Sequence, residues 1–185
     1  IPVATREGGI EVTLDLPKEE CLRYTGITLC GLTNGESPKW LRESLEAIGH
    51  KSINAIVDIS NFVLFELGHP IHIFDADKIE GNSLTLCHIP EGTPFTTLDG
   101  VERKAGGKEI MICDAAKRVL CMAGVLGGTD AEVTDKTTRV FVECANFNAT
   151  AIRKAARRHG ISTDASFRFE RGLAPEACDN ALRRT

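Results

Sequence analysis

The first part of the chain changes from strand-like alternation to helical periodicity. Residues 10–32, IEVTLDLPKEECLRYTGITLCGL, alternate and are rich in Val, Ile, Thr and Leu, which predicts strands on either side of a turn at Pro17. A helix is predicted next, with Ser37 as its N-cap, Pro38 in its first turn and Gly49 as its stop. The side chains expected to face inward from this helix are Trp40, Leu41, Leu45 and Ile48.

A second helix is predicted over residues 55–67, ending at Gly68. Its apolar run resembles a buried strand, but its length favours a helix. Three polar residues interrupt this run, namely Asp58, Asn61 and Glu66.

Short β segments dominate the middle of the chain from residue 84. The strand candidates are LTLCHI, PFTTL, IMICD, RVLCMA and RVFVECA, and Asp99-Gly100 is a strong hairpin signal. Residues 124–138, GVLGGTDAEVTDKTT, are too rich in glycine for regular structure, so we expect a loop there.

Helices return near the C-terminal end. A basic helix, TAIRKAARRH, is predicted between an Asn148 N-cap and Gly160. Thr163 and Ala165 are expected to bracket a polar turn between this helix and a following strand, and Pro175 begins a last helix. The fold class predicted is α+β, with mostly antiparallel or mixed sheets flanked by helices.

Composition narrows the class of protein. The chain has 185 residues, of which 42% are hydrophobic and 26% are charged. This length and composition predict that residues 1–185 form a single domain made of two closely packed modules. No run of about 20 apolar residues and no signal-peptide pattern is present, so we expect no membrane association. The chain begins without Met and stops within a predicted helix, so we expect a piece of a longer polypeptide.

The cysteines and the charge indicate a cytosolic protein that does not coat nucleic acid. Seven scattered cysteines form no CxxC pair and lie mostly in apolar runs, where they behave as small buried hydrophobes in a reducing compartment. A net charge of -4 argues against binding along a whole nucleic-acid surface and against DNA as a partner. It is compatible with contact to the end of one strand.

Two histidines in GHPIHIFD are the first candidates for chemistry. His69 and His72 have the spacing of a helical metal site, but Pro70 breaks that geometry and no third ligand is near in sequence. We therefore expect no metal ligands. The remaining interpretations are core or turn histidines, or a His72 that positions a substrate or water.

Glu143 and a glycine loop are the next candidates. Gly124, Gly127 and Gly128 either let the backbone approach a ligand or simply form a tight turn after a strand. Strand alternation places Glu143 on the same face as Phe141, so a core-facing Phe141 implies a buried carboxylate able to read a ligand hydroxyl. The alternative is a surface carboxylate at a sheet edge.

The basic segment RKAARRHGISTDASFRFERG allows two interpretations. Arg153, Lys154, Arg157 and Arg158 would form a helix face that holds phosphates, or merely a solvated face. Arg168 either adds to this charge together with Arg171 or forms a structural ion pair with Glu170. There is no GxSxG nucleophile elbow, so a Ser-His-Asp triad is not indicated.

Several long segments together resemble one family. SINAIVDISNFVLFELGHPIHIFDADKIEG, ECLRYTGITLCGL, GVLGGTDAEVTDKTT and VFVECANFNATAIRKAARRHGISTDASFRFERGLAP are similar, in order, to the editing module of the bacterial-type phenylalanyl-tRNA synthetase beta subunit. The resemblance covers nearly the whole chain. It implies an editing, tRNA-binding domain that hydrolyses tyrosine wrongly attached to phenylalanine tRNA.

The resemblance also implies roles for individual residues. Glu143 would read the tyrosine hydroxyl, with backbone help from Gly124 and Gly127. His72 and Thr163 would be the catalytic residues around the ester and the hydrolytic water. The other implied substrate-binding residues are Ala165, Pro70 and Lys51.

Two positions depart from the family pattern. Lys51 stands where many relatives carry arginine and loses the bidentate fork. Thr129-Asp130 replaces a common glutamate.

Partners and cofactors follow from the same resemblance. The expected partners are the tyrosine-carrying 3′ end of tRNA(Phe) and an alpha subunit in a heterotetramer. No cofactor is expected in this domain, and ATP and Mg²⁺ would belong to the synthetic site elsewhere. The rival hypotheses are a non-catalytic tRNA-docking or structural module, an unrelated interaction domain, and a metallohydrolase built on His69 and His72.

Overall fold

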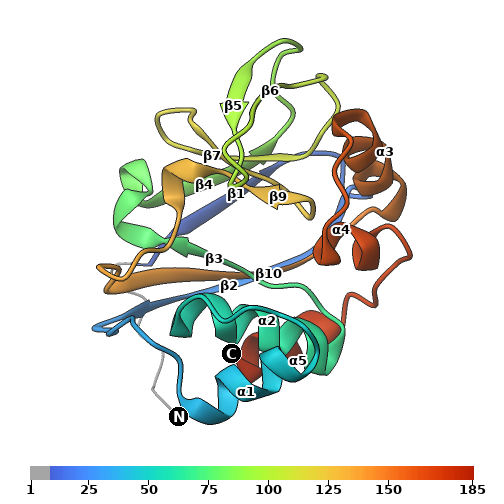
Figure 1. The fold of residues 1–185 in the computed structure, drawn as a ribbon. Coiled ribbons are helices and arrows are strands. Elements are labelled where there is room, and N and C mark those ends of the chain that lie inside the picture. The colour runs from blue at the N-terminus through green and yellow to red at the C-terminus, as the bar shows by residue number, and fades with distance from the viewer. Residues whose placement is uncertain (1–8) are drawn as a thin grey trace.

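The fold consists of two sheets stacked over a layer of helices (Figure 1). This computed structural model describes residues 9–185. One sheet has five strands in the order β1-β4-β7-β8-β9, and the other has three in the order β2-β10-β3. Helices α1, α2 and α5 lie beneath the three-stranded sheet, and α3 and α4 lie at one side (Figure 1). The predicted α+β class is confirmed.

The five-stranded sheet is mixed. β1 pairs with β4 in parallel, and every other pairing in the sheet is antiparallel. Its strands are β1 (Glu11–Asp15), β4 (Ser83–Cys87), β7 (Met111–Asp114), β8 (Val119–Met122) and β9 (Leu126–Gly127). A separate hairpin, β5 (Pro94–Thr96) and β6 (Glu102–Lys104), turns at the predicted Asp99-Gly100.

The central strand of the three-stranded sheet, β10, pairs with two strands that come much earlier in the sequence. β10 (Arg139–Phe147) lies antiparallel between β2 (Cys21–Cys30) and β3 (His72–Asp75). All of β10 except its first residue is buried, so both faces of the strand are covered. Alternate β10 residues therefore enter two different cores, one above the strand and one below.

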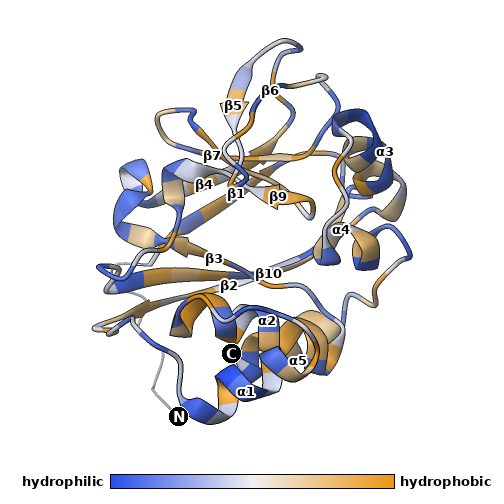
Figure 2. Cartoon of the chain, in the orientation of Figure 1, coloured by the Kyte–Doolittle hydropathy of each residue, from blue (hydrophilic) through white to orange (hydrophobic). Residues whose placement is uncertain are grey.

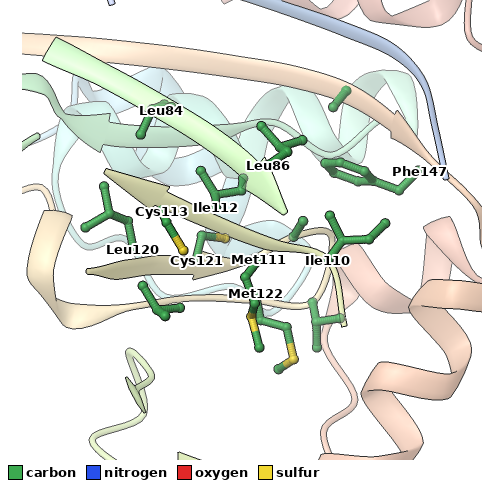
Figure 3. Packing of buried hydrophobic residues seen from close by; sticks show 14 of the residues in the cluster. Leu84, Leu86, Ile110, Met111, Ile112, Cys113, Leu120, Cys121, Met122 and Phe147 are labelled. Carbon is green, nitrogen blue, oxygen red and sulfur yellow. The ribbon is translucent and has the colours of Figure 1, made fainter. Parts of the chain in front are cut away.

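The larger core fills the space between the two sheets. Phe141, Ala145 and Phe147 of β10 belong to this core with apolar residues of β4, β7 and β8. Figure 3 shows Phe147 beside Leu86 and Ile110. Cys113 and Cys121 belong to this core, as expected of buried cysteines. Two smaller apolar clusters lie on the opposite face of β10. One contains Val140 and Val142 with Ile56 and Val133. The other contains Cys144 with Val63, Cys178 and Ala181.

Helix ends follow local sequence signals where those signals are strong. α2 (Ala55–Leu67) has the predicted bounds, because Asn54 caps its first turn and Gly68 adopts the left-handed conformation at its end. α3 (Ala149–His159) begins after Asn148 and ends before Gly160, also as predicted. The last helix, α5 (Ala177–Arg184), begins two residues after Pro175.

The prediction for α1 (Lys39–Ala47) is partly wrong. Pro38 is its N-cap, and the Ser37 hydroxyl instead donates to Asp58 at 2.5 Å. Only Leu41 and Leu45 are buried. Trp40 and Ile48 are more than half exposed, although the Trp40 ring packs edge-on against Phe62 of α2 with ring centroids 5.4 Å apart.

Two further corrections concern the glycine-rich loop and the segment after α3. The loop contains the short strand β9 and the 3₁₀ turn Thr129–Ala131, and two other 3₁₀ turns cover Ala76–Lys78 and Glu80–Asn82. The segment after α3 leads into a helix, α4 (Asp164–Phe169), and not into a strand.

Hydropathy follows this layering. α2 is mainly apolar along its length, whereas the outer faces of α1 and α3 are hydrophilic (Figure 2). Among residues 9–185, no helix combines the length and apolar character needed to cross a bilayer.

Candidate active site

A cavity of about 570 Å³ lies between the three-stranded sheet and the glycine loop, closed at its sides by α2 and α4. This volume is in the range of small-ligand pockets. Seven of the eight site residues expected from the sequence line it, namely Pro70, His72, Gly124, Gly127, Glu143, Thr163 and Ala165. They come from four separate parts of the chain, and the fold brings them together.

Glu143 lies opposite His72 in the antiparallel register of β10 and β3. Directly opposed residues in such a pair point to the same face, with their Cβ atoms about 5 Å apart. Phe141 is core-facing on this same side, which confirms that Glu143 is buried and not at a sheet edge. The carboxylate is only 4% exposed.

Tyr24 supplies a hydrogen bond to this carboxylate. Its hydroxyl donates to Glu143 Oε2 at 3.0 Å, from β2 on the other side of β10. Burial raises the pKa of Glu143 to about 8, against an opposing effect from the Tyr24 hydroxyl. Within residues 9–185, no hydrogen bond joins Oε1 to another group. One carboxylate oxygen thus remains for a ligand.

The His72 ring is held in the neutral form. Burial lowers the pKa of His72 to about 4, and its ring packs edge-on against Phe74 at a centroid distance of 4.4 Å. A neutral imidazole can accept a hydrogen bond from water, although the lowered pKa makes His72 a weak proton acceptor at neutral pH.

At two positions of the loop, Gly124 and Gly127, neighbouring side chains lie so close to the backbone that a Cβ atom would collide with them. A Cβ at Gly127 would lie 2.7 Å from His72 Cε1, so any larger residue would displace that ring. Gly124 has a φ of +67° and lies against Ile152, Phe147 and Phe169. At both positions the backbone itself forms the cavity wall.

Thr163 connects α4 to the glycine loop. Its hydroxyl donates to the Val125 carbonyl at 2.8 Å and accepts from the Ser166 N–H at 3.0 Å in a capping box. The hydroxyl proton is therefore committed to the loop, and the N-terminus of α4 is fixed at the cavity. Ala165 follows in the first turn of this helix and adds little bulk to the wall.

Lys51 is the expected site residue that does not line the cavity. It is exposed, in the segment between α1 and α2, and its neighbour Ile53 reaches the cavity rim. Buried Asp58 holds this segment by accepting from the Ser52 hydroxyl at 2.5 Å and from the Ile53 N–H at 2.9 Å.

The fold shown by these elements has a counterpart among known proteins. Residues 20–185 match the family described as the B3/4 domain. The chain belongs to the B3/4 domain family. This match covers every strand and helix of the structure except β1.

Relatives of this B3/4 domain include phenylalanine–tRNA ligase beta subunits. The subunit from Porphyromonas gingivalis is 55% identical over 164 residues, covering 89% of this chain and 20% of the relative. The subunit from Bacteroides thetaiotaomicron is 51% identical over 174 residues, covering 94% and 21%. The chain thus spans about one fifth of the length of the curated relatives it matches.

A solved structure shares the fold. An N-terminal fragment of the phenylalanyl-tRNA synthetase beta subunit from Pyrococcus horikoshii superposes with a TM-score of 0.59 at 14% sequence identity. The superposition covers 86% of this chain and 52% of that one. The B3/4 architecture is therefore retained at low identity.

Sequence reasoning missed the residue that holds Glu143 and two residues that line the cavity. Tyr24 gave no signal, because its partner Glu143 is 119 residues away. Cys121 of β8 also lines the cavity. Asn61 was visible as a polar residue within an apolar helix, and it too lines the cavity.

The basic segment lies outside the cavity. Arg153, Lys154 and Arg157 are exposed on α3, whereas Arg158 pairs with Glu91 and Glu109. A second hollow, of about 440 Å³, adjoins α3 and is lined by charged residues of both signs.

Of the alternatives for Arg168, the ion pair with Glu170 is not the one that forms. Arg168 pairs with Asp164 one turn earlier, at 3.0 Å. Glu170 pairs with Arg171, at 2.8 Å.

Proposed function

We propose that this B3/4 domain carries out post-transfer editing, hydrolysing the ester that joins tyrosine to the 3′ end of tRNA(Phe). The observation that carries the proposal is the Glu143 carboxylate in the cavity, with Oε2 bound to Tyr24 and Oε1 without a partner among the described residues. The proposal places the chain within the beta subunit of a phenylalanine–tRNA ligase, as the relatives' names suggest.

Glu143 would select tyrosine over phenylalanine. A cavity that only has to tolerate an added hydroxyl discriminates weakly, whereas a cavity built to bind that hydroxyl rejects its absence strongly. The tyrosine hydroxyl would pair with Oε1, and phenylalanine would leave this buried oxygen without a partner. Leaving a buried polar group without a hydrogen-bond partner costs about 1–3 kcal/mol, which corresponds to about fivefold to 150-fold selectivity.

Hydrolysis in this cavity requires an oriented water and not a strong nucleophile, because an aminoacyl ester is already activated. Neutral His72 lies next to the expected position of the amino acid and would accept a hydrogen bond from that water. Thr163 would keep the glycine loop in register with α4 through Val125. The backbone at Gly124 and Gly127 would approach the substrate without a side chain between them.

The surroundings of the reaction are part of the same proposal. The substrate would be the tyrosylated end of tRNA(Phe), and an alpha subunit would complete a heterotetrameric enzyme in the cytoplasm. ATP and Mg²⁺ would act only at the synthetic site elsewhere in that enzyme. Exposed Arg153, Lys154 and Arg157 would lie close enough to meet tRNA phosphates outside the cavity.

The alternative is a tRNA-docking module without hydrolytic activity. It is favoured by the position of Lys51, which the family resemblance would place near the terminal nucleotide but which does not line the cavity. This alternative predicts tRNA binding with no release of tyrosine above the spontaneous rate.

The test is release of tyrosine from Tyr-tRNA(Phe) by the ligase that contains this chain, with Phe-tRNA(Phe) measured in parallel. The wild-type enzyme should release tyrosine selectively, and Glu143→Ala should lose most of that selectivity. The control is Glu46→Ala on the exposed surface of α1, which should behave as wild type. A wild-type enzyme that leaves Tyr-tRNA(Phe) intact would reject the editing function.

A further inference from the structure

Three side chains that could bind a metal ion lie close together on the face of β10 that packs against the helices, away from the cavity. His69 follows α2, Cys144 lies on β10 and Cys178 lies in the first turn of α5. One potential ligand atom from each lies within 4.8 Å of the other two. All three residues are at most 1% exposed.

The distances within this cluster suit a metal ion. His69 Nε2 lies 3.6 Å from Cys178 Sγ. Zinc binds thiolates at about 2.3 Å and imidazoles at about 2.0–2.1 Å, so a tetrahedral arrangement separates sulfur from nitrogen by about 3.6 Å. The observed separation therefore matches two ligands on one edge of a zinc tetrahedron.

An oxygen is available for a fourth position. The Ala145 carbonyl oxygen lies 3.1 Å from His69 Nε2, on the residue after Cys144. The carbonyl is part of the strand backbone, so its place beside the three side chains is fixed by β10 itself. The remaining surroundings are apolar, with Val63, Ala181 and Leu182 packed around the cluster.

Of the two ring nitrogens of His69, Nε2 is hydrogen-bonded to the Ala145 carbonyl, and an ion bound at Nε2 would replace that hydrogen bond. His69 Nδ1 is buried with no hydrogen-bond partner among residues 9–185.

We propose that His69, Cys144 and Cys178 form a structural Zn²⁺ site, with the Ala145 carbonyl as the nearest fourth oxygen. Binding would release one proton from each thiol, and the proton of His69 would reside on Nδ1 so that Nε2 binds the ion. The proposal replaces the expectation from sequence that the chain has no metal ligands. It is independent of the proposed editing reaction.

The site would fasten the last helix to the centre of the fold. Cys178 is the contact of α5, His69 fixes the start of the segment that leads to Pro70 and His72, and Cys144 is adjacent to Glu143. The ion would therefore stabilise the docking of α5 and the floor of the cavity. Zinc-bound histidines usually donate a hydrogen bond from their other ring nitrogen, and His69 Nδ1 has no acceptor for it among residues 9–185. We therefore expect the affinity for Zn²⁺ to be about 10- to 100-fold below that of a site in which this hydrogen bond is made.

Metal content and cobalt spectroscopy test this site. The protein is purified under reducing conditions without chelator, and its zinc is measured by elemental mass spectrometry. The zinc is then removed and Co²⁺ is titrated, since thiolate ligands give cobalt intense charge-transfer absorption. We expect one equivalent of zinc, one equivalent of cobalt with this absorption, and a melting temperature that rises when zinc is restored.

Variants locate the ion. Cys178→Ser should abolish the charge-transfer absorption and the rise in melting temperature, whereas the exposed-cysteine control Cys30→Ser should keep both. The wild-type titration does not depend on any variant folding. Absent cobalt absorption in the reduced wild type, absorption retained in Cys178→Ser, or a Cys144–Cys178 disulfide in the freshly purified protein would each overturn the proposal.

Discussion

The hydroxyl of Tyr24 donates to Glu143 Oε2 across two neighbouring strands that are 119 residues apart in sequence. The carboxylate is thereby fixed by one phenol of the protein itself. In the proposed reaction, the phenol of the substrate would meet the other oxygen. Tyr24 would thus set the orientation in which Glu143 recognises tyrosine.

Tyr24→Phe should weaken recognition of tyrosine while leaving the ring packing intact. The variant removes only the hydroxyl that orients Glu143, so we expect hydrolysis of Tyr-tRNA(Phe) to fall about tenfold and that of Phe-tRNA(Phe) to stay unchanged. Single-turnover deacylation measures both rates. Thr25→Val, which removes a hydroxyl from the other face of β2, is the control. Equal loss on both substrates would show that Tyr24 does not act through Glu143.

Gly127→Ala should disturb the cavity. The new Cβ would lie 2.7 Å from His72 Cε1 and 2.8 Å from Leu98 Cδ1, so the imidazole must move. We expect a loss of about 1–3 kcal/mol in the free energy of unfolding and a clear loss of hydrolysis. The control is Gly35→Ala, because nothing lies within 4 Å of a Cβ there. Denaturant unfolding and the deacylation assay measure the two effects, and a wild-type result in both would contradict the close contact.

His72 should make the fold less stable in mild acid. Its pKa is about 4 in the folded state and about 6.5 in the unfolded state, so only the unfolded state gains a proton as the pH falls from 7 to 5. The free energy of unfolding should therefore drop by about 2 kcal/mol from this residue between those pH values.

Comparison with His72→Gln isolates this contribution. Urea unfolding at pH 7 and pH 5 should show a smaller drop in the variant than in the wild type. The other titratable groups around the cavity are common to both proteins, namely Cys121, Glu132, Glu143 and Asp164. An equal drop in both proteins would mean that His72 protonates in the folded state.

Asp58→Asn should destabilise the fold from outside the cavity. Asp58 accepts from two serine hydroxyls and one N–H, and an amide offers one oxygen in place of two. We expect the free energy of unfolding to fall by about 2–4 kcal/mol, as when a buried hydrogen-bond network is broken. Asp130→Asn on the exposed surface serves as the control in the same urea titration.

The sequence predicted those features that depend on neighbouring residues. α2 and α3 have strong caps, Asn54 with Gly68 and Asn148 with Gly160, and their bounds agree with prediction. The alternation of β10 was enough to predict that Glu143 shares the buried face of Phe141.

Features that depend on distant segments were not predictable in the same way. α4 has six residues and is held by its capping box and by the contact of Thr163 with Val125, so periodicity gives little signal for it. Trp40 stays more than half exposed although its ring packs edge-on against Phe62 of α2, a partial contact that helical periodicity does not reveal. The cluster of His69, Cys144 and Cys178 joins three elements that no spacing in the chain connects.

The position of β10 determines when the chain can fold during synthesis. Its partner β2 is made about 120 residues earlier, and α5, which covers its lower face, is made last. Contacts of such long sequence separation slow folding, because the loop between them must close first. β2 and β3 both pair with β10, so the unpaired edges of this sheet would remain open on the ribosome until β10 emerges.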